Sequence, residues 1–241
     1  MQRYFDIHSH ILPGVDDGAK NMEETRRMLL AAYEEGFRII TATPHFVAGK
    51  KSMPVENLKK ILERVNQVAA SISEELEVIL GNELFYSLQM LEALKKGDAL
   101  TIDDTRYILV EFYQNVSFHE LWEGLNNCIF EGYIPILAHA ERYRCLLKKS
   151  ELVEKLISLG VYIQINMSSI VGHLWKPGRR FSHKLLHREW VHFLGSDAHD
   201  LEHRRPRAKK ATAVIEKKYG VQMIQLLLWE NPLTMVEDSN L

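Results

Sequence analysis

Two histidines near the beginning of the chain, His8 and His10, are separated by one residue. Alternate residues of an extended strand point to the same face, so we expect the two imidazoles to face a common point. Asp197 and His199 repeat this spacing near the other end of the chain. Imidazoles and carboxylates without thiolates are typical ligands of Zn, Mn, Fe and other divalent ions. The two pairs predict a metal site, provided that the fold brings them together.

Four more residues of the same chemical types follow short apolar runs: His45, Glu83, Glu111 and His139. A lone histidine at a strand end more often only forms hydrogen bonds, whereas buried glutamates are rare unless they are paired or bound to metal. Taken jointly, five histidines and at least three carboxylates are too many for one four-coordinate ion. We therefore predict two or three metals bridged by carboxylates, as in enzymes that cleave phosphate esters.

Acidic residues close to the first histidine pair are weaker candidates. Asp16-Asp17-Gly18 is also ordinary turn chemistry, so this tripeptide alone does not predict a ligand. Asp6 shares the strand face of His8 but lies one step deeper. We therefore expect Asp6 to orient a ligand rather than to bind a metal directly.

Arginines follow two of the candidate ligands. Arg142 lies three residues after His139, and Arg204 and Arg205 come shortly after His199. An arginine beside metals is costly unless an anion also occupies the site, and its fork of N–H donors matches phosphate. The alternative, an ion pair with a nearby glutamate, stays open from the sequence. The glutamates in question are Glu141 and Glu202.

The two cysteines test another route to phosphate chemistry. Cysteine-dependent phosphatases need an arginine six positions after the nucleophile, but Cys128 leads to Ile134 and Cys145 leads to Glu151. The sequence therefore argues against a thiolate phosphoenzyme. The absence of a CxxC pair excludes a thiolate zinc site, and the absence of a GxxxxGK loop excludes that device for binding nucleoside triphosphates.

The elements that must position these residues alternate between short apolar runs and amphipathic stretches. Runs of about six residues rich in Ile, Val, Leu or aromatics predict strands. The stretches between them predict helices, several of which precede a glycine of the kind that ends helices. We expect the final helix to stop before Pro232, because the residue before a proline avoids the α region. The predicted strands are Tyr4–His8, Arg38–Thr43, Glu77–Glu83, Tyr107–Phe112, Ile134–His139, Val161–Asn166 and His192–Asp197. The predicted helices are Met22–Glu35, Pro54–Glu75, Ser87–Lys96, Phe118–Glu131, Ser150–Leu159, Ser182–Glu189, Arg207–Tyr219 and Val221–Trp229.

Strands and helices that alternate in one uninterrupted series predict an α/β fold with a parallel sheet. With seven strands and no dinucleotide fingerprint, we favour a distorted (β/α)7 TIM-like barrel over an open sheet. The first and last strands of a barrel are neighbours, so the pair at His8 would meet the pair at Asp197. In such folds the active site lies at the C-terminal ends of the strands. A length of 241 residues with 46% apolar residues predicts one domain, spanning residues 1–241.

Composition limits the partners of the chain. Lys and Arg number 30 against 32 Asp and Glu, so no basic field would attract nucleic acid. We find neither a run of about 18 apolar residues, as a membrane span requires, nor the apolar core of a signal peptide. We therefore expect a cytoplasmic protein without membrane insertion and without a nucleic-acid partner. The oligomeric state stays open.

The order of these motifs resembles that of the polymerase-and-histidinol-phosphatase (PHP) superfamily. More narrowly, the chain resembles the manganese-dependent bacterial protein tyrosine phosphatases of capsule and exopolysaccharide gene clusters. The long string DIHSHILPGVDDG at residues 6–18 is specific, and shorter motifs continue in the same order through nearly the whole chain. These shorter motifs are Ala42–His45, Gly81–Glu83, Val110–Phe112, Ala138–Tyr143, Gln164–Asn166 and Gly195–His199.

The resemblance implies a distorted seven-stranded barrel that holds three metal ions, with Mn as the first candidate and Zn, Fe or Mg as alternatives. It implies hydrolysis of phosphotyrosine in a partner protein, the tail of a bacterial tyrosine kinase that regulates polysaccharide export. By motif, the implied ligands of the deeper metals are His8, His10, Glu83, Glu111, His139 and Asp197. The groups implied around the third metal are Asp17, His45 and His199, and the implied phosphate-binding residues are Arg142 and Arg204.

Two departures and two rival functions accompany this resemblance. Phe46 stands where many relatives have a second histidine or a tyrosine, and the loop Gly172–Phe181 differs between members, so both bear on substrate entry. A protonated His199 is one candidate for the group that protonates the leaving group. One rival function is a PHP-family phosphatase acting on a small ester such as histidinol phosphate. The other is a metal-binding regulatory module without turnover, against which the complete ligand set argues.

Overall fold

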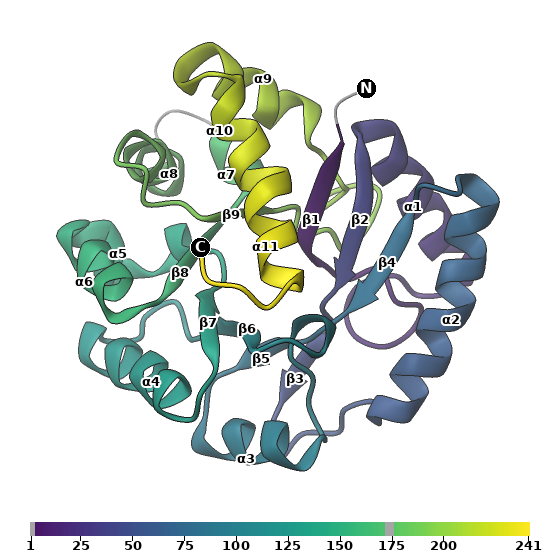
Figure 1. Ribbon diagram of the computed structural model, residues 1–241, viewed down its shortest axis with the longest axis horizontal. Coiled ribbons are helices and arrows are strands. Elements are labelled where there is room, and N and C mark those ends of the chain that lie inside the picture. The colour runs from purple at the N-terminus through teal and green to yellow at the C-terminus, as the bar shows by residue number, and fades with distance from the viewer. Residues whose placement is uncertain (1–2, 172–175) are drawn as a thin grey trace.

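The computed structural model describes residues 3–171 and 176–241 as parallel strands surrounded by helices (Figure 1). Every paired strand runs parallel to its neighbour, as the alternating series predicts. A three-stranded sheet has the order β1 (Tyr4–Ser9), β2 (Phe37–Ala42) and β4 (Glu77–Leu80). A six-stranded sheet has the order β3 (His45–Val47), β5 (Glu83–Phe85), β6 (Tyr107–Glu111), β7 (Ile134–Leu137), β8 (Tyr162–Asn166) and β9 (Phe193–Gly195).

The described residues thus form nine strands where the sequence predicts seven. The second predicted strand breaks at Thr43-Pro44, because proline has no N–H to donate to a sheet ladder. The third breaks at Gly81-Asn82, where an added Cβ would lie 3.3 Å from the backbone of Ile102. After each break the chain continues into the second sheet, so that His45 pairs in register with Glu83.

Two predicted strands also end earlier than expected. The strands β7 and β9 stop at Leu137 and Gly195, whereas the sequence predicts strands that reach His139 and Asp197. His139 has φ +35° and Asp197 has φ +53°, values in the left-handed region that an extended strand cannot include. Both candidate ligands therefore lie on the turn just beyond a strand.

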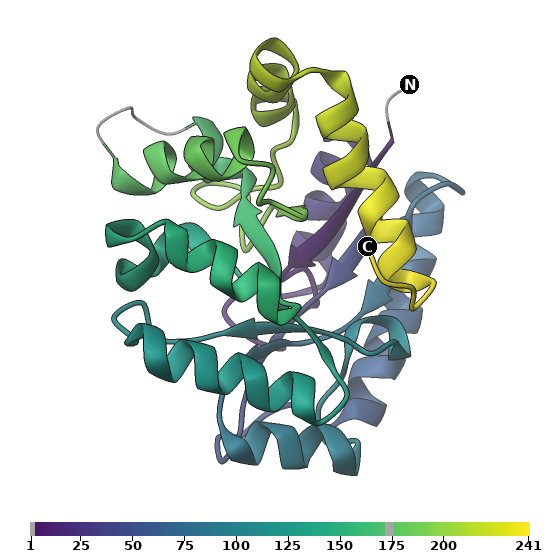
Figure 2. The same ribbon diagram turned by 60° about the vertical axis from the view of Figure 1, so that its left-hand side comes forward.

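The first and last strands of the chain meet across the gap between the two sheets. Ser9 and Ala198 form an isolated parallel bridge, the His10 amide donates to the Ala198 carbonyl at 2.8 Å, and the Asp197 amide donates to the His8 carbonyl at 2.9 Å. These contacts bring the ends of β1 and β9 together, as the sequence predicts. Among the described residues the ladders nevertheless form two sheets rather than one closed ring, as a turned view also shows (Figure 2).

Helices cover the outside of the sheets, and their ends follow the capping chemistry of the sequence. Helix α1 begins after Asn21, whose side chain accepts from the Glu24 amide, and ends at Gly36 with φ +106°. The remaining helices are α2 (Val55–Ile72), α3 (Leu88–Lys96), α4 (Phe118–Phe130), α5 (Arg144–Lys148), α6 (Glu151–Leu159), α7 (Met167–Val171), α8 (Pro177–His187), α9 (Lys209–Tyr219), α10 (Val221–Gln225) and α11 (Asn231–Val236), with α1 at Met22–Glu35. Short 3₁₀ turns are η1 (Ile102–Asp104) and η2 (Ala140–Arg142), and η3 (Leu226–Glu230) is a π turn.

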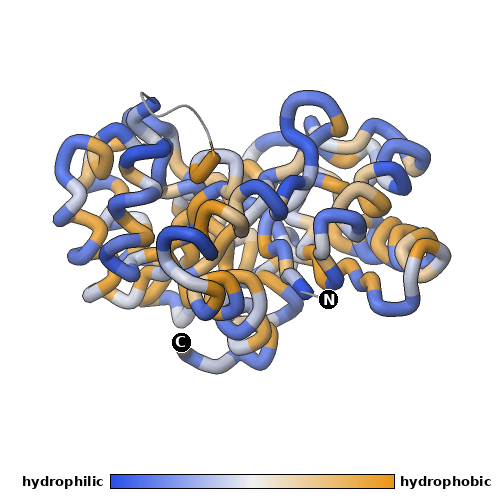
Figure 3. Tube along the Cα trace, turned by 90° about the horizontal axis from the view of Figure 1, so that it is seen from above, coloured by the Kyte–Doolittle hydropathy of each residue, from blue (hydrophilic) through white to orange (hydrophobic). Residues whose placement is uncertain are grey.

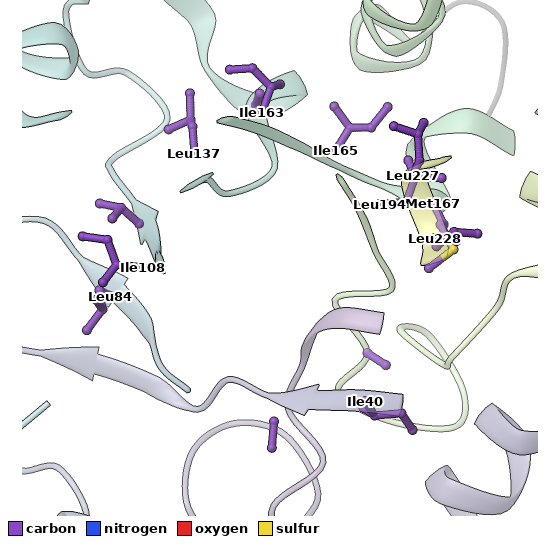
Figure 4. Close-up of a cluster of buried hydrophobic side chains, with 14 of the residues drawn as sticks. Ile40, Leu84, Ile108, Leu137, Ile163, Ile165, Met167, Leu194, Leu227 and Leu228 are labelled. Atoms are coloured by element: carbon purple, nitrogen blue, oxygen red, sulfur yellow. The ribbon is translucent and has the colours of Figure 1, made fainter. Parts of the chain in front are cut away.

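Two hydrophobic clusters hold this arrangement together. The larger lies between strands and helices, where Leu84, Ile108 and Leu137 from successive strands are buried (Figure 4). The smaller lies on the opposite strand face and includes Phe5 and Leu109. Strand residues thus alternate between an outer face toward the helices and an inner face, and the candidate ligands continue the inner face.

The C-terminal helical segment does not stop before Pro232, contrary to the sequence-based expectation. It runs on through α11, which begins at Asn231 and carries the proline in its first turn. The π turn η3 directly precedes it and relaxes the backbone where a proline ring would otherwise meet the preceding helical turn. Met235 of α11 is buried in the inner cluster, and this segment crosses in front of the strands in Figure 1.

Another helix boundary also differs: α8 begins at Pro177 rather than at Ser182, since proline is favoured in the first helical turn. Apolar and polar segments alternate along the helices, as expected of helices that have one buried face (Figure 3). Within residues 3–171 and 176–241, none of the helices combines the length and the apolar character that a membrane span requires.

Candidate metal centre

The two histidines of β1 meet as their spacing predicts. His8 and His10 are almost fully buried, and their Nε2 atoms lie 3.2 Å apart. Their ring centroids are separated by 5.3 Å. The two imidazoles therefore present their nitrogens to a common point at the end of the strand.

Glu83 lies at the centre of the site. Its carboxylate is 1% exposed and contacts imidazole nitrogens from four different histidines. The Oε2 atom lies 3.1 Å from His8 Nε2 and 3.2 Å from His10 Nε2, and Oε1 lies 2.8 Å from His139 Nε2. His45 Nδ1 lies 3.1 Å from Oε2. A carboxylate with this many neighbours is placed to bridge two cations.

Asp197 provides a second buried carboxylate on the opposite side of the histidine pair. Its Oδ1 atom lies 3.6 Å from His8 Nε2 and 3.7 Å from His10 Nε2. Arg142 Nη2 donates to Asp197 Oδ2 at 2.6 Å, and Arg204 Nη2 donates to Oδ1. The prediction that residues from the first and last strands converge is thus confirmed.

A third group of donors lies closer to solvent. His45 Nε2 and His199 Nε2 lie 3.4 Å and 3.3 Å from the same oxygen, Asp17 Oδ1. The side chain of Asp17 is 63% exposed, so this carboxylate lies at the mouth of the site. Glu111 closes the other side of His45, with Oε1 3.3 Å from Nδ1.

The donors fall into three overlapping groups, in each of which one ligand atom per residue lies within 4.8 Å of every other. Residues shared between the groups would bridge neighbouring ions, as in sites with two or three metals. The nine candidate ligands of the sequence analysis are all brought together, eight within these groups and His139 through its contact with Glu83. The groups are His8, His10, Glu83 and Asp197; His10, Asp17, His45 and His199; and His45, Glu83 and Glu111.

The donor set fits divalent cations on chemical grounds. The buried nitrogen His199 Nε2 has no hydrogen-bond partner among the described residues, although it faces Asp17. The Nε2 atoms of His8 and His10 face each other and two carboxylates at 3.1–3.7 Å, so lone pairs converge on one small region. Cations relieve the repulsion between such lone pairs, and the mixture of nitrogen and oxygen donors suits Mn, Fe or Zn.

The titration of these groups reflects their mutual contacts. Burial lowers the pKa of His10, but its hydrogen bonds with Asp16 and Glu83 outweigh this effect and raise that pKa to about 9. Burial likewise opposes the rise in the pKa of His139, which its bonds with Glu111 and Glu83 bring to about 9. Burial would raise the pKa of Glu83, but the neighbouring imidazoles hold it well below its usual range. The carboxylates thus stay ionised, as metal ligands must.

Residues behind the ligands orient them. Asp16 Oδ2 lies 2.7 Å from His10 Nδ1 and also accepts from the His45 amide at 3.1 Å. Gln164 Oε1 accepts from the His139 amide at 2.6 Å, and Asn166 Nδ2 donates to Asp197 Oδ2 at 2.7 Å. The sequence analysis attributes no orienting role to these three residues. For Asp16 a signal existed in the Asp16-Asp17-Gly18 turn, which is read there as ordinary turn chemistry.

Asp6 holds the backbone rather than a ligand ring. Its Oδ1 atom accepts from the Ser196 amide at 2.8 Å and from the His8 amide at 3.3 Å. Burial raises the pKa of Asp6 to about 6, against the opposing effect of its bonds with Ser196. Asp6 thereby fixes the chain next to Asp197, a different contact from the ligand orientation that the sequence suggests.

The two arginines of the prediction both reach the centre. Arg142 and Arg204 contact opposite oxygens of Asp197, and their side chains remain 33% and 39% exposed. The alternative pairing of Arg142 with Glu141 is not what the contacts show, since Glu141 accepts from Ser169 Oγ and from the Asn166 amide. Arg205 is exposed and forms no ion pair with another described residue.

The cysteines lie outside this chemistry. Cys128 is fully buried in the larger cluster, and burial raises its pKa to about 12. Burial also raises the pKa of Cys145. Neither thiol is therefore ionised near neutral pH, which agrees with the missing arginine partner in the sequence.

Phe46 does not line the entrance, although the sequence analysis connects it with substrate entry. Its ring is 6% exposed and packs in the larger cluster on the helix side of β3. The loop Gly172–Phe181 falls partly on residues 172–175, which lie outside the described residues. Its described part leads into α8.

Comparisons with known proteins agree with this site. Tyrosine-protein phosphatase CpsB of Streptococcus pneumoniae is 35% identical over 239 residues, covering 97% of this chain and 98% of that protein. Tyrosine-protein phosphatase YwqE of Bacillus subtilis (strain 168) is 32% identical over 229 residues, covering 92% and 87%. A chain from the crystal structures described as YwqE from Bacillus subtilis and CpsB from Streptococcus pneumoniae, unique metal-dependent tyrosine phosphatases, superimposes with a TM-score of 0.89 at 31% identity. It covers 98% of this chain and 95% of the other. The family model for capsular polysaccharide synthesis, CpsB/CapC, matches residues 4–237, and the chain therefore belongs to the CpsB/CapC family.

Proposed function

We propose that this chain is a metal-dependent protein tyrosine phosphatase that acts in capsular polysaccharide synthesis. The observation that carries this proposal is the convergence of nine histidine and carboxylate donors beside two partly exposed arginines. Imidazole and carboxylate donors supply the metal site, and the arginines supply donors for a phosphoryl group. Membership of a family whose named relatives are tyrosine-protein phosphatases supports the substrate class.

The residues divide the work of phosphate ester hydrolysis. His8, His10, Glu83, Glu111, His139 and Asp197 would hold the deeper ions, and Asp17, His45 and His199 would hold a third. Bound ions would acidify a water molecule and neutralise charge on the phosphoryl oxygens.

Arg142 and Arg204 bind the phosphoryl oxygens and keep the ester in position for attack. Their guanidinium groups remain partly exposed beside Asp197, so an anion can reach them from solvent. Since phenolate is a good leaving group, it needs little help from an acid. We assign that help to His199, which lies between the centre and the exposed Asp17.

Several finer features belong to the same proposal. We propose three ions with Mn as the physiological metal, because its preference for nitrogen and oxygen donors matches the site, with Zn, Fe and Mg as alternatives. We further propose that residues 1–241 form one domain in which the two sheets act as a distorted seven-unit barrel. The partner would be the phosphorylated tail of a bacterial tyrosine kinase, met in the cytoplasm.

The test is turnover of a phosphotyrosine peptide after chelation and reloading with Mn, Zn or Mg, with the metal content measured in parallel. We expect activity to disappear with the metal and to return with it. Absence of turnover by fully loaded protein would favour a regulatory metal-binding module. Much faster cleavage of histidinol phosphate than of the peptide would favour the small-ester phosphatase.

A further inference from the structure

Two aromatic residues lie one step outward from two candidate ligands on neighbouring strands. Phe85 follows Glu83 by two residues at the end of β5, and Tyr113 follows Glu111 by two residues beyond β6. Alternate residues of an extended segment share a face, so each aromatic residue continues the face of its glutamate. The strands are paired, with Phe85 in register with Glu111.

The intervening residues support this orientation. Leu84 and Phe112, which lie between each glutamate and its aromatic neighbour, are buried in the larger cluster on the helix side. Phe112 stacks there on Tyr86 at a centroid distance of 4.9 Å. Phe85 and Tyr113 therefore face away from the helices, toward the mouth of the metal centre.

The pair is exposed in a way that hydrophobic burial does not explain. Tyr113 is 70% exposed, and its ring meets that of Phe85 edge to face at 4.6 Å. Such a pair is stabilising, yet it leaves one large aromatic surface open to water. Exposed aromatic surface beside a polar site is typical of a binding surface for an apolar group.

We propose that Phe85 and Tyr113 form an aromatic wall that holds the phenyl ring of a phosphotyrosine residue while its phosphoryl group lies at the metal centre. Successive residues on one strand face are about 6.7 Å apart, so the wall lies one such step outward from the carboxylates of Glu83 and Glu111. The ring of an aryl phosphate is joined to the phosphoryl group through a single oxygen. A ring whose phosphoryl group is bound at the centre must therefore lie within this next step.

This inference rests on the proposed phosphatase function and adds a source of preference for aryl esters. An aryl ring can pack edge to face or offset on the wall, and such contacts are worth enough to change binding by up to about tenfold. Inorganic phosphate has no ring and gains nothing from the wall. The metals and arginines would therefore bind phosphate equally well with or without the two aromatic side chains.

The experiment measures kcat/KM on a phosphotyrosine peptide and the inhibition constant of inorganic phosphate, using Mn-loaded protein. The variants are Tyr113→Ala, Phe85→Leu and Tyr113→Phe, and the control is Phe130→Ala, an 86% exposed aromatic residue of α4. We expect kcat/KM to fall about tenfold in Tyr113→Ala and Phe85→Leu, with the inhibition constant unchanged. Tyr113→Phe keeps the ring and should restore the preference, whereas Phe130→Ala should behave as the wild type.

The outcomes separate this inference from the function on which it rests. A wild type that does not cleave the peptide overturns the proposed function and the aromatic wall together. An active wild type whose Tyr113→Ala and Phe85→Leu variants retain full kcat/KM overturns the wall alone. A parallel loss of phosphate inhibition in these variants also overturns it, because the side chains would then support the centre rather than hold the ring.

Discussion

His139 is the single residue whose removal separates the metal mechanism from a thiol mechanism most cleanly. Its Nε2 atom contacts both Glu83 at 2.8 Å and Glu111 at 3.5 Å, so its loss leaves two carboxylates without a shared partner. We expect His139→Ala to abolish turnover and to lower the metal content of the purified protein. Cys145→Ser should leave activity nearly unchanged. Activity assays with metal analysis check both variants, and an inactive Cys145→Ser protein would overturn the mechanism.

Asp16 illustrates a residue that acts through a ligand. Its Oδ2 atom lies 2.7 Å from His10 Nδ1, so the carboxylate fixes the ring orientation and the tautomer that presents Nε2 to the centre. Loss of such a partner typically lowers metal affinity by about 10- to 100-fold. We expect Asp16→Asn to need correspondingly more Mn for half-maximal activity, measured by metal titration, and to recover most activity at saturating metal. A variant that stays inactive at saturating Mn contradicts this orienting role.

His192 lies away from the centre and connects pH to stability. Burial lowers its pKa to about 4, and its Nδ1 atom accepts from the Ile163 amide at 3.1 Å. A histidine that is neutral when folded but takes up a proton when unfolded stabilises the fold above its unfolded pKa of about 6.5. This contribution declines as pH falls from about 6.5 and is lost below about 4.

We therefore expect the free energy of unfolding of the wild type to fall by up to about 3 kcal/mol over this range because of His192 alone. His192→Asn can keep an acceptor for the Ile163 amide but does not titrate, so its stability should depend less on pH. Urea unfolding of both proteins between pH 7 and pH 4 measures the difference. Equal slopes for the two proteins would show that His192 is not the titrating group.

At the scale of elements, the sequence predicted where strands lie better than where they end. Each of the seven predicted runs contains an observed strand, because apolar runs bounded by polar residues have a clear period. The breaks at Pro44 and Gly81 went unnoticed, since period alone does not reveal that a chain leaves one sheet for another. The early ends at Leu137 and Gly195 depend on left-handed backbone at His139 and Asp197, which no propensity of these residue types demands.

The candidate site was more predictable than the boundaries for a physical reason. Ligand types and the two-residue spacing of His8 and His10 are visible in the letters of the sequence, and parallel strands carry their ends to one edge. The orienting groups were not visible. Gln164 and Asn166 reach His139 and Asp197 only through contacts between residues 25 and 31 positions apart.

The loop between β1 and α1 depends on close packing at Gly18. A Cβ at this position would overlap the carbonyl of His10 and lie 2.6 Å from the His10 Cβ, so the backbone would have to move. We expect Gly18→Ala to lower the free energy of unfolding by about 1–3 kcal/mol and to weaken Mn binding. Gly178→Ala is the control, because its nearest new contact is 3.4 Å away. Thermal unfolding and metal titration check both, and equal behaviour of the two variants contradicts the packing argument.

At the scale of the whole molecule, the metal centre lies where the two sheets meet. His8 comes from β1 in the first sheet, whereas Glu83 comes from β5 and His45 from β3 in the second. The opposite face of the inner core is packed by the C-terminal segment, which buries Met235. Ions held by residues of both sheets would therefore act as a link between them.

This arrangement predicts that the metals stabilise the whole fold. A ligand that binds only the folded state stabilises it by about 4 kcal/mol at a thousandfold excess over its dissociation constant. For a chain of this size such a change corresponds to a shift in Tm on the order of 10 °C. We expect chelation to lower Tm by this order, and hydrogen exchange to increase first where Ser9 meets Ala198, because that junction has one backbone bridge. Cys145→Ser should keep the full shift, whereas His139→Ala should show little of it, because it holds less metal from the start. A Tm that is identical with and without chelator would mean that the two sheets hold together without the ions.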